Sequence, residues 1–315
     1  MNNFVFKLFL LLIFCTNSIC VEAFSFQKDG IKYEYYYGYL IVVGLVNEFS
    51  YDWITIPYDV EYKGKTYRVE AIKKSAFSGS NMSGITCYTI SSIEDFAFQY
   101  CSYMRKIDIS VNNRNIGKGI FCGTQLLKVR VDETNENYDS RNNCNAIIET
   151  KTNKLVAGTD QTIIPDNVEC IAAYAFSGLY HLDSVYIPKS VKEIEGMAFY
   201  DVYGTLSKIY VEAVDPPTIY QDSFSGYFSG NPTPYEYSTL YVPEGSMEKY
   251  KNHPIWSQFR NIQEFKSTTS IDRISVGKSD DDRYYDANGR LLKSPSRGLT
   301  IIKMKDGKAK KVFVR

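Results

Sequence analysis

The sequence predicts a mainly β solenoid, a stack of short coils that each contribute one parallel strand. The main observation is a phrase that occurs six times, an isoleucine followed five residues later by a phenylalanine that usually has alanine before it. A unit this short cannot bury its apolar face alone, so neighbouring copies are expected to stack into one continuous core. The phenylalanines, which are the expected core residues, lie at intervals of 21, 23, 55, 23 and 25 residues: Phe77, Phe98, Phe121, Phe176, Phe199 and Phe224.

A second pattern locates the strand of each coil. In five runs an aliphatic residue stands on each side of a charged residue or a tyrosine, which is typical of a strand buried on one side: 107–109, 129–131, 185–187, 209–211 and 240–242. Coils of this kind align their strands into a parallel sheet along one flank, with a spacing of about 4.8 Å. The alanine and phenylalanine of each phrase are then expected on the opposite flank.

The amino end predicts an export signal over residues 1–23. A basic residue precedes the apolar run 8–14, which is too short to span a bilayer, and residues 21–23 offer a small-residue cleavage site. A secreted or cell-surface location is therefore expected, with no membrane span after the signal is removed. The competing interpretation is a lipid anchor on Cys15 or Cys20.

Covers are expected at both ends of the repeat body, because a solenoid would otherwise expose strand edges that template aggregation. Residues 24–66 are rich in strand patterns and predict an N-terminal β cap, and the repeats follow over 67–265. At the far end Ser246 is suited to begin a short helix. Helical spacing then continues through Ile255, Trp256, Phe259 and Ile262. This segment predicts a short helical C-terminal cap, in which Trp256 closes the last coil.

Two segments depart from the regular repeat. The interval of 55 residues between Phe121 and Phe176 contains two strand-like runs, so we expect a β-hairpin inserted near 144–158, with a structural role rather than that of a ligand-binding finger. Residues 266–315 form a polar linker followed by Asn-Gly and Asp-Gly turns, which accept the positive φ of tight hairpins. A small antiparallel β module is therefore predicted at the carboxyl end.

Four stretches of the chain are similar to a known family. They are the strand and phrase over 184–199, the segment 137–148, the closing Thr-Leu-Tyr-Val-Pro-Glu-Gly-Ser of 239–246, and the carboxyl tail. Together they resemble the BspA-like subgroup of leucine-rich repeat proteins over nearly the whole mature chain. The resemblance implies an exported surface or secreted protein, in a family associated with adhesion, without catalytic residues. The tail resembles those of exported proteins of anaerobic Gram-negative bacteria, in which the family is typical, and is either a sorting signal or a plain terminal β module.

Composition excludes several kinds of partner and chemistry. The 315 residues include 36 basic and 36 acidic side chains, so no field is expected that would steer the protein to nucleic acid or to an anionic membrane. The two histidines, His181 and His253, have no nucleophile or metal ligand at a suitable spacing. Five scattered cysteines remain after the signal and are expected to be core thiols, with a single disulfide as the alternative. We therefore expect a monomer without enzymatic activity, cofactor or metal.

The outward side of the strand ladder is the predicted binding face. Alternate residues of a strand point to opposite faces, which gives two exposed columns, one with Arg130, Tyr186, Tyr210 and Tyr241 and one with Lys106, Lys128 and Lys208. The hypothesis is that the three tyrosines form a docking strip for a glycan or an extended peptide. The alternative is that these tyrosines only pack on each other across strands.

Two functions follow from this interpretation. The leading one is a non-enzymatic extracellular recognition scaffold, which binds proteins or glycans on host or bacterial surfaces in the manner of an adhesin. The alternative is a structural or glycan-capture accessory protein of the cell surface. Both use a stacked scaffold whose exposed side chains decide what it binds.

Overall fold

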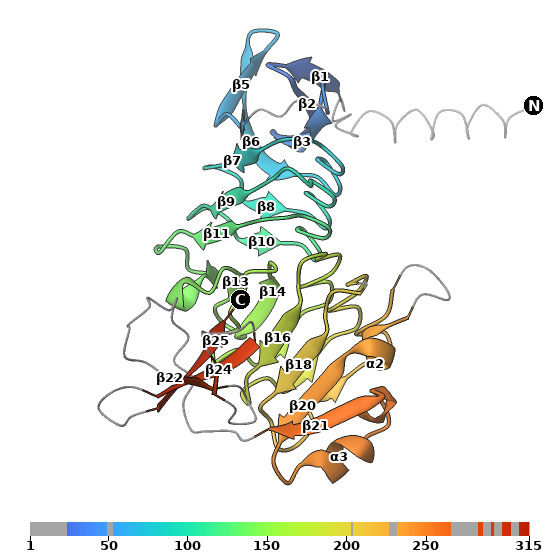
Figure 1. The fold of residues 1–315 in the computed structure, drawn as a ribbon. Coiled ribbons are helices and arrows are strands. Elements are labelled where there is room, and N and C mark those ends of the chain that lie inside the picture. The colour runs from blue at the N-terminus through green and yellow to red at the C-terminus, as the bar shows by residue number, and fades with distance from the viewer. Residues whose placement is uncertain are drawn as a thin grey trace, which may run out of the picture.

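The computed structural model describes residues 24–48, 53–202, 204–226, 232–265 and four short strands between 283 and 314. The predicted fold class is confirmed, because the chain winds into a stack of coils whose short strands lie side by side, with the N-terminal cap at the top of Figure 1 and the helical end at the bottom. The export signal predicted for 1–23 and the linker that follows residue 265 lie outside the described residues.

The N-terminal cap is an antiparallel meander followed by a hairpin. Its strands are β1 (Ser25–Lys28), β2 (Ile31–Tyr36), β3 (Tyr39–Leu45), β5 (Asp59–Tyr62) and β6 (Lys65–Ile72). Tight turns join them because Gly30, Gly38 and Gly64 adopt positive φ. Strand β3 then pairs in parallel with β6 and so joins the cap to the first coil. The ring of Phe26 stacks on that of Tyr62 at 4.0 Å between centroids, which ties the meander to the hairpin.

Each coil of the first half contributes two short strands, one to each flank. One flank is a parallel sheet, here called the first ladder: β4 (Trp53–Thr55), β7 (Gly84–Thr86), β9 (Lys106–Ile109) and β11 (Lys128–Val131). The other flank continues β6 with β8 (Ser92–Ile93) and β10 (Asn115–Ile116), which carry the isoleucine of the repeated phrase. The sequence predicts one strand per coil, and these two-residue strands are an addition to that prediction.

Buried asparagines close the corner between the two flanks. The side chain of Asn113 is completely buried; its Nδ2 donates to the carbonyl of Ile90 at 2.7 Å and its Oδ1 accepts the Ser110 N–H at 2.8 Å. In the next coil the Nδ2 of Asn135 donates to the Ser110 carbonyl at 2.7 Å. Each amide thus satisfies backbone groups that the turn leaves without a strand partner.

A hairpin separates the two halves of the stack, where the sequence predicts one. It follows β12 (Tyr138–Asp139) and the 3-10 turn η1 (Arg141–Asn143), and consists of β13 (Ile147–Glu149) and β14 (Lys154–Ala157) in antiparallel pairing. Strand β14 then pairs in parallel with β15 (Cys170–Ile171), so the hairpin also begins a sheet of the second half.

The second half repeats the two-flank arrangement. One flank extends β15 with β17 (Glu193–Ile194) and β19 (Thr218–Ile219). The other flank is a parallel sheet, here called the second ladder: β16 (Ser184–Ile187), β18 (Lys208–Val211), β20 (Thr239–Pro243) and β21 (Asn261–Phe265). The strands that the sequence predicts as one ladder therefore belong to two separate sheets.

The six phenylalanines of the repeated phrase are all buried, none more than 3% exposed. In the second half their rings stack face to face: Phe176 on Phe199 at 5.0 Å and Phe199 on Phe224 at 4.8 Å. The residue before the ring is small in five of the six phrases, and Ile120 before Phe121 is the exception; Ala198, for example, has no exposed surface. The five described cysteines are also buried and free, which agrees with core thiols rather than a disulfide.

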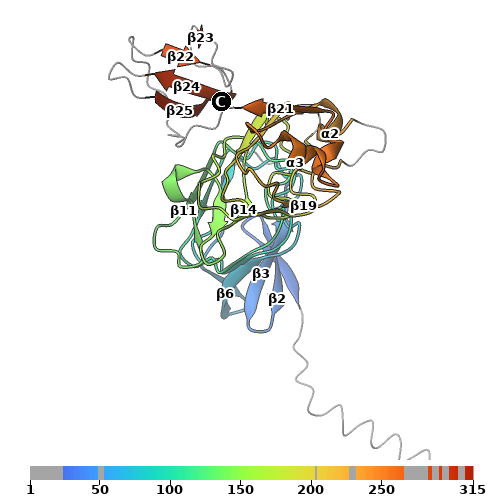
Figure 2. The same ribbon diagram turned by 90° about the horizontal axis from the view of Figure 1, so that it is seen from below.

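The far end of the stack is covered by α2 (Pro234–Tyr237), α3 (Met247–Lys251) and the 3-10 turn η2 (Trp256–Gln258), which gather beside β21 (Figure 2). Trp256 is completely buried against Phe224, as predicted. The expectation that the helical segment continues as far as Ile262 is wrong, because β21 pairs with β20 through five residues and Ile262 is one of them. Ser246 precedes α3, but its hydroxyl donates to the Pro243 carbonyl at 2.6 Å rather than capping the helix.

The carboxyl module is the small antiparallel sheet that its turns predict. Its order is β23 (Leu291–Leu292), β22 (Arg283–Tyr285), β24 (Gly298–Lys303) and β25 (Ala309–Val314). The Asn-Gly and Asp-Gly turns themselves lie outside the described residues. A sorting role for this module remains a prediction.

Candidate functional site

The predicted binding residues are divided between the two ladders. Lys106, Lys128 and Arg130 lie on the outer face of the first ladder, in β9 and β11. The second ladder holds the others on its outer face: Tyr186, Tyr210, Tyr241 and Lys208. The hairpin stands between the two sets, so the structure does not bring all seven residues onto one sheet.

The expectation that Tyr186 and Tyr210 are exposed is wrong, since they are only 5% and 4% exposed. They face each other across β16 and β18 with ring centroids 6.4 Å apart, and Tyr241 stacks on Tyr210 at 4.5 Å. Phe265, at the end of β21, packs its ring against the edge of Tyr210 at 5.8 Å. The alternative of cross-strand packing therefore describes these contacts, and the tyrosines form a small outer core in place of an open strip.

Lys208 shares the second ladder with this cluster. It is half-buried in β18, and its neighbours in register are Ser184 on β16 and Thr239 on β20. No carboxylate partner of Lys208 is found among the described residues. The lysine therefore lies beside a covered aromatic cluster, and not beside the other three predicted cations.

The first ladder keeps its outer face open and carries a linked set of charges. Asp108 on β9 accepts the Lys106 ammonium at 2.7 Å and the Arg130 Nε at 3.1 Å. Arg130 stands directly opposite Asp108 in register, and Lys128 opposite Lys106. The Arg130 side chain is 67% exposed, so these are surface pairs that arrange the cations more than they stabilise the fold.

An exposed tryptophan completes this face, and sequence reasoning missed it. Trp53, in β4, is 46% exposed and lies in register with Gly84 of β7. Its indole Nε1 donates to the Thr86 hydroxyl at 2.7 Å. The available signal was the alternation of Trp53, Ile54 and Thr55, in which the half-buried isoleucine points inward and both neighbours point outward.

The exposed carboxylate of Asp132 borders this face. Hydrogen bonds from Thr134 and, to a smaller extent, the charge of Arg130 lower the pKa of Asp132, which follows the end of β11. The outer face of the first ladder and its border therefore carry permanent charges of both signs at neutral pH, with Lys106, Lys128 and Arg130 as the cations.

The sequence model of the BspA type leucine rich repeat region matches residues 60–147 and 147–274, with six copies of the repeat. The chain belongs to this BspA-type family. The match spans β7, β9 and β11 of the first ladder, the hairpin and the second ladder, and it begins after β4. Membership supports a repeat-based surface protein with an extracytoplasmic location. No curated protein matches the chain.

Several solved structures are similar to this BspA-type chain. A leucine rich cell surface protein from Faecalibacterium prausnitzii is 15% identical, with a TM-score of 0.35, and the match covers 78% of this chain and 95% of that one. A leucine-rich repeat protein from Bacteroides ovatus is 19% identical, with a TM-score of 0.32 and 76% of each chain covered. One from Eubacterium ventriosum is 17% identical, with a TM-score of 0.35, 71% of this chain and 73% of that chain.

Catalytic groups are not assembled in the described part of this BspA-type protein. His181 is exposed, while burial lowers the pKa of His253, whose Nδ1 accepts the backbone N–H groups of Ile255 and Trp256. Burial also raises the pKa of the Cys87 thiol to about 12, so it forms no thiolate nucleophile at neutral pH. No cluster of three or more His, Cys, Asp or Glu side chains that could hold a metal occurs among the described residues.

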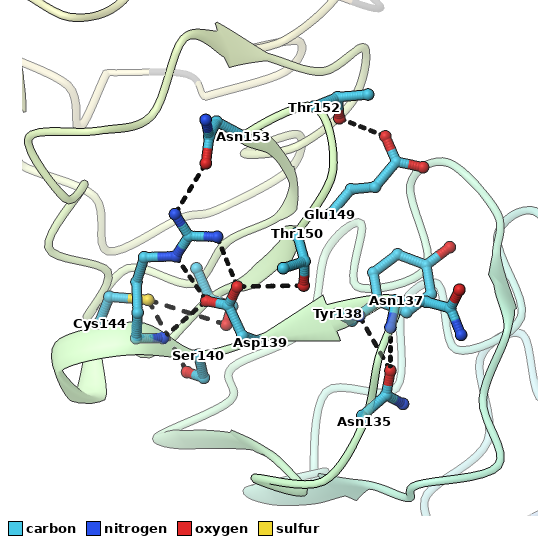
Figure 3. Close-up of polar contacts among 12 residues, drawn as sticks. Asn135, Asn137, Tyr138, Asp139, Ser140, Cys144, Glu149, Thr150, Thr152 and Asn153 are labelled. Atoms are coloured by element: carbon cyan, nitrogen blue, oxygen red, sulfur yellow. Dashed lines mark hydrogen bonds and ion pairs between the residues drawn. The ribbon is translucent and has the colours of Figure 1, made fainter.

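The densest polar cluster belongs to the hairpin and is structural. The guanidinium of Arg141 donates through Nε to Asp139 at 2.7 Å and through Nη1 to Asn153 at 2.8 Å, while Thr150 donates to the other oxygen of Asp139. Figure 3 shows Asp139, Thr150 and Asn153 converging at this corner. Burial acts to raise the pKa of Asp139, but the hydrogen bonds from Arg141 lower it overall. These bonds join Arg141 of η1 to Asn153 and Asp139 of β12 to Thr150, and so fix η1 to the hairpin. The donors and acceptors are paired with one another, which is why we assign the cluster a structural role.

No helix within the described ranges is long and apolar enough to cross a membrane.

Proposed function

We propose that this protein is a non-enzymatic extracellular recognition scaffold that binds a protein or glycan on a host or bacterial surface, in the manner of an adhesin. The binding face is the outer side of the first ladder. The observation that carries the proposal is the contrast between the two ladders: aromatic residues pack on each other on the second, while Trp53 is left 46% exposed on the first, on the same outer face as Lys106 and Arg130.

Trp53 leaves 46% of its surface available for contact. Large aromatic side chains and arginine are enriched where proteins bind partners, because they offer a large contact area and directional hydrogen bonds. On this face they stand on a rigid parallel sheet, so binding needs little ordering of the protein. Membership of the BspA-type family supports the same interpretation, since it places the repeats in a surface protein.

The proposal is tested by binding of the purified protein to a glycan array, a panel of host-matrix proteins and bacterial cells. A variant that combines Trp53→Ala, Lys128→Gln and Arg130→Gln removes the aromatic side chain and two of the three cations from the outer face of the first ladder. The matched control combines Tyr37→Ala with Lys74→Gln and Lys151→Gln, which are exposed residues away from the first ladder. We expect the face variant to lose binding at an unchanged melting temperature while the control keeps it. Equal binding by both proteins would exclude the first ladder as the recognition face, and binding restricted to glycans would assign the protein to glycan capture.

A further inference from the structure

The ring of Trp53 is held flat on the outer face of the first ladder. A Cβ atom placed on Gly84 would lie 2.4 Å from Cζ3 of this indole, so the ring occupies the space that a side chain at position 84 would fill. The bond from its Nε1 to the Thr86 hydroxyl, 2.7 Å long, fixes the orientation of the ring. One ring face therefore covers the glycine, and the side chain still presents 46% of its surface to solvent.

The register of the strands places cations in line with this ring. Across the ladder, Trp53 is opposite Gly84, Gly84 opposite Lys106, and Lys106 opposite Lys128. Adjacent strands are about 4.8 Å apart. Lys128 and Arg130, both on β11, therefore lie two strands, or roughly 10 Å, beyond β7, whose Gly84 the indole covers. That separation corresponds to about two sugar units, because one pyranose extends an oligosaccharide by about the distance between neighbouring strands.

The outer face has an excess of positive charge. It carries Lys106, Lys128 and Arg130 against the single carboxylate of Asp108, which both Lys106 and Arg130 contact. Arg130 uses Nε for that contact, and its side chain is 67% exposed, so the guanidinium is turned to solvent. Lys128 is exposed as well and has no ion-pair partner within the described residues. Asp132 borders the face beyond β11 and limits the excess on that side.

We infer that this face binds an acidic oligosaccharide, with a pyranose ring stacked on Trp53 and a carboxylate or sulfate group, about two sugars along, bound by Lys128 and Arg130. The inference rests on the proposed function and names its ligand class. The apolar C–H side of a pyranose is flat and matches the exposed indole. The anionic group matches the guanidinium, which recognises carboxylates and sulfates through paired N–H donors.

Two other classes of ligand fit this face less well. Single-stranded nucleic acid is bound by several aromatic residues in succession along a basic groove, whereas Trp53 is the one aromatic side chain among the outward positions of β4, β7, β9 and β11. A protein interface has an apolar centre that is depleted of charge. Here the positions around the tryptophan are glycine, threonine, lysine, aspartate and arginine.

Tryptophan fluorescence gives a direct readout, since the chain contains two tryptophans and Trp256 is completely buried. Acrylamide quenching of the whole protein therefore reports on Trp53. The probes are a tetrasaccharide of galacturonic acid, a sulfated tetrasaccharide from chondroitin sulfate, neutral maltotetraose and a single-stranded DNA of 12 nucleotides. We expect one or both acidic saccharides to protect the indole from acrylamide in a saturable way, and maltotetraose to bind about tenfold more weakly or worse. Added salt should weaken the acidic saccharides only.

Three variants assign the contacts. Trp53→Ala and the pair Lys128→Gln with Arg130→Gln should each weaken acidic saccharide binding about tenfold, measured by calorimetry. Gly84→Ala keeps the tryptophan but places a methyl group where its ring lies, so it should weaken binding by displacing the ring. The pair Lys74→Gln with Lys151→Gln is the charge-matched control and should change affinity less than twofold. Melting temperatures show whether each variant remains folded.

The results separate this inference from the proposed function. If the neutral tetrasaccharide binds as tightly as the acidic ones, if DNA protects Trp53 better than either, or if no saccharide protects it, the assignment to acidic saccharides is wrong. The recognition face still stands in those cases if the variant lacking Trp53, Lys128 and Arg130 loses binding to a protein or a cell surface. Acidic saccharide binding that is unchanged in Trp53→Ala and Gly84→Ala would overturn the inference as well.

Discussion

Replacing Phe199 with alanine tests the layered core that supports every surface feature of the molecule. The Phe199 side chain is completely buried, and its ring is stacked between Phe176 at 5.0 Å and Phe224 at 4.8 Å. A buried Phe→Ala change costs roughly 3 to 5 kcal/mol, because transfer free energy is lost and a cavity remains. Each aromatic pair adds about 0.5 to 1.5 kcal/mol beyond burial, which places this site near the upper limit.

Phe121 provides the matched comparison within the same repeat phrase. It is 3% exposed, and no ring pair among the described residues includes it. We therefore expect Phe121→Ala to cost about 3 kcal/mol and Phe199→Ala about 1 to 2 kcal/mol more. Urea unfolding followed by circular dichroism gives both values. Equal losses at the two sites, or a loss below about 1 kcal/mol at Phe199, would refute the stacked core.

Three further predictions follow from side chains that the structure buries. Tyr210→Ala should lower the free energy of unfolding by roughly 3 kcal/mol, whereas the exposed Tyr37→Ala should stay within about 0.5 kcal/mol in the same urea titration; equal values would show that the tyrosine cluster is open. Asn113→Ala should cost about 1 to 3 kcal/mol, because it leaves two buried backbone groups without a partner, and a cost near zero would contradict its role at the corner. Burial raises the pKa of the Cys87 and Cys101 thiols to about 12 and about 11, so iodoacetamide at pH 8 should modify them only after unfolding. The unfolded chain loses these protons first, so stability should fall as the pH rises from about 8.5 towards 11, and a stability that rises over this range would contradict the assignment.

The repeat phrase was sufficient to predict the stacked fold, because its isoleucine and phenylalanine are the residues that the coils bury. Ile194 and Phe199 are both completely buried, and their spacing recurs in each coil. Spacing alone was insufficient at the end cap, where Trp256 and Phe259 lie in and beside a 3-10 turn while Ile262 pairs within a strand. Backbone pairing with a neighbouring strand outweighed helical periodicity there.

The candidate site was harder to predict, because alternation along a strand specifies a side of the sheet and not what covers that side. Tyr210 and Arg130 have the same position within their strands, yet one ring is buried and the other side chain is two-thirds exposed. Tyr241 and Phe265 both pack on the Tyr210 ring, and Phe265 lies 55 positions beyond Tyr210, outside the repeated phrase. Trp53 was missed for a related reason, since its partner Gly84 is set by strand register.

The division of the strand ladder explains why only one half presents an open face. At the last rung of the first ladder, the Asn145 side chain accepts the Val129 N–H at 2.7 Å and donates to the Leu127 carbonyl at 3.0 Å, in the place of another strand. The first ladder therefore ends after four strands, a width of about 14 Å at the usual spacing. Beyond the hairpin the second ladder starts anew with tyrosines that pack on one another. Because one side chain ends the sheet, charged and aromatic residues of the first ladder stay separate from that covered cluster and remain free to contact a ligand.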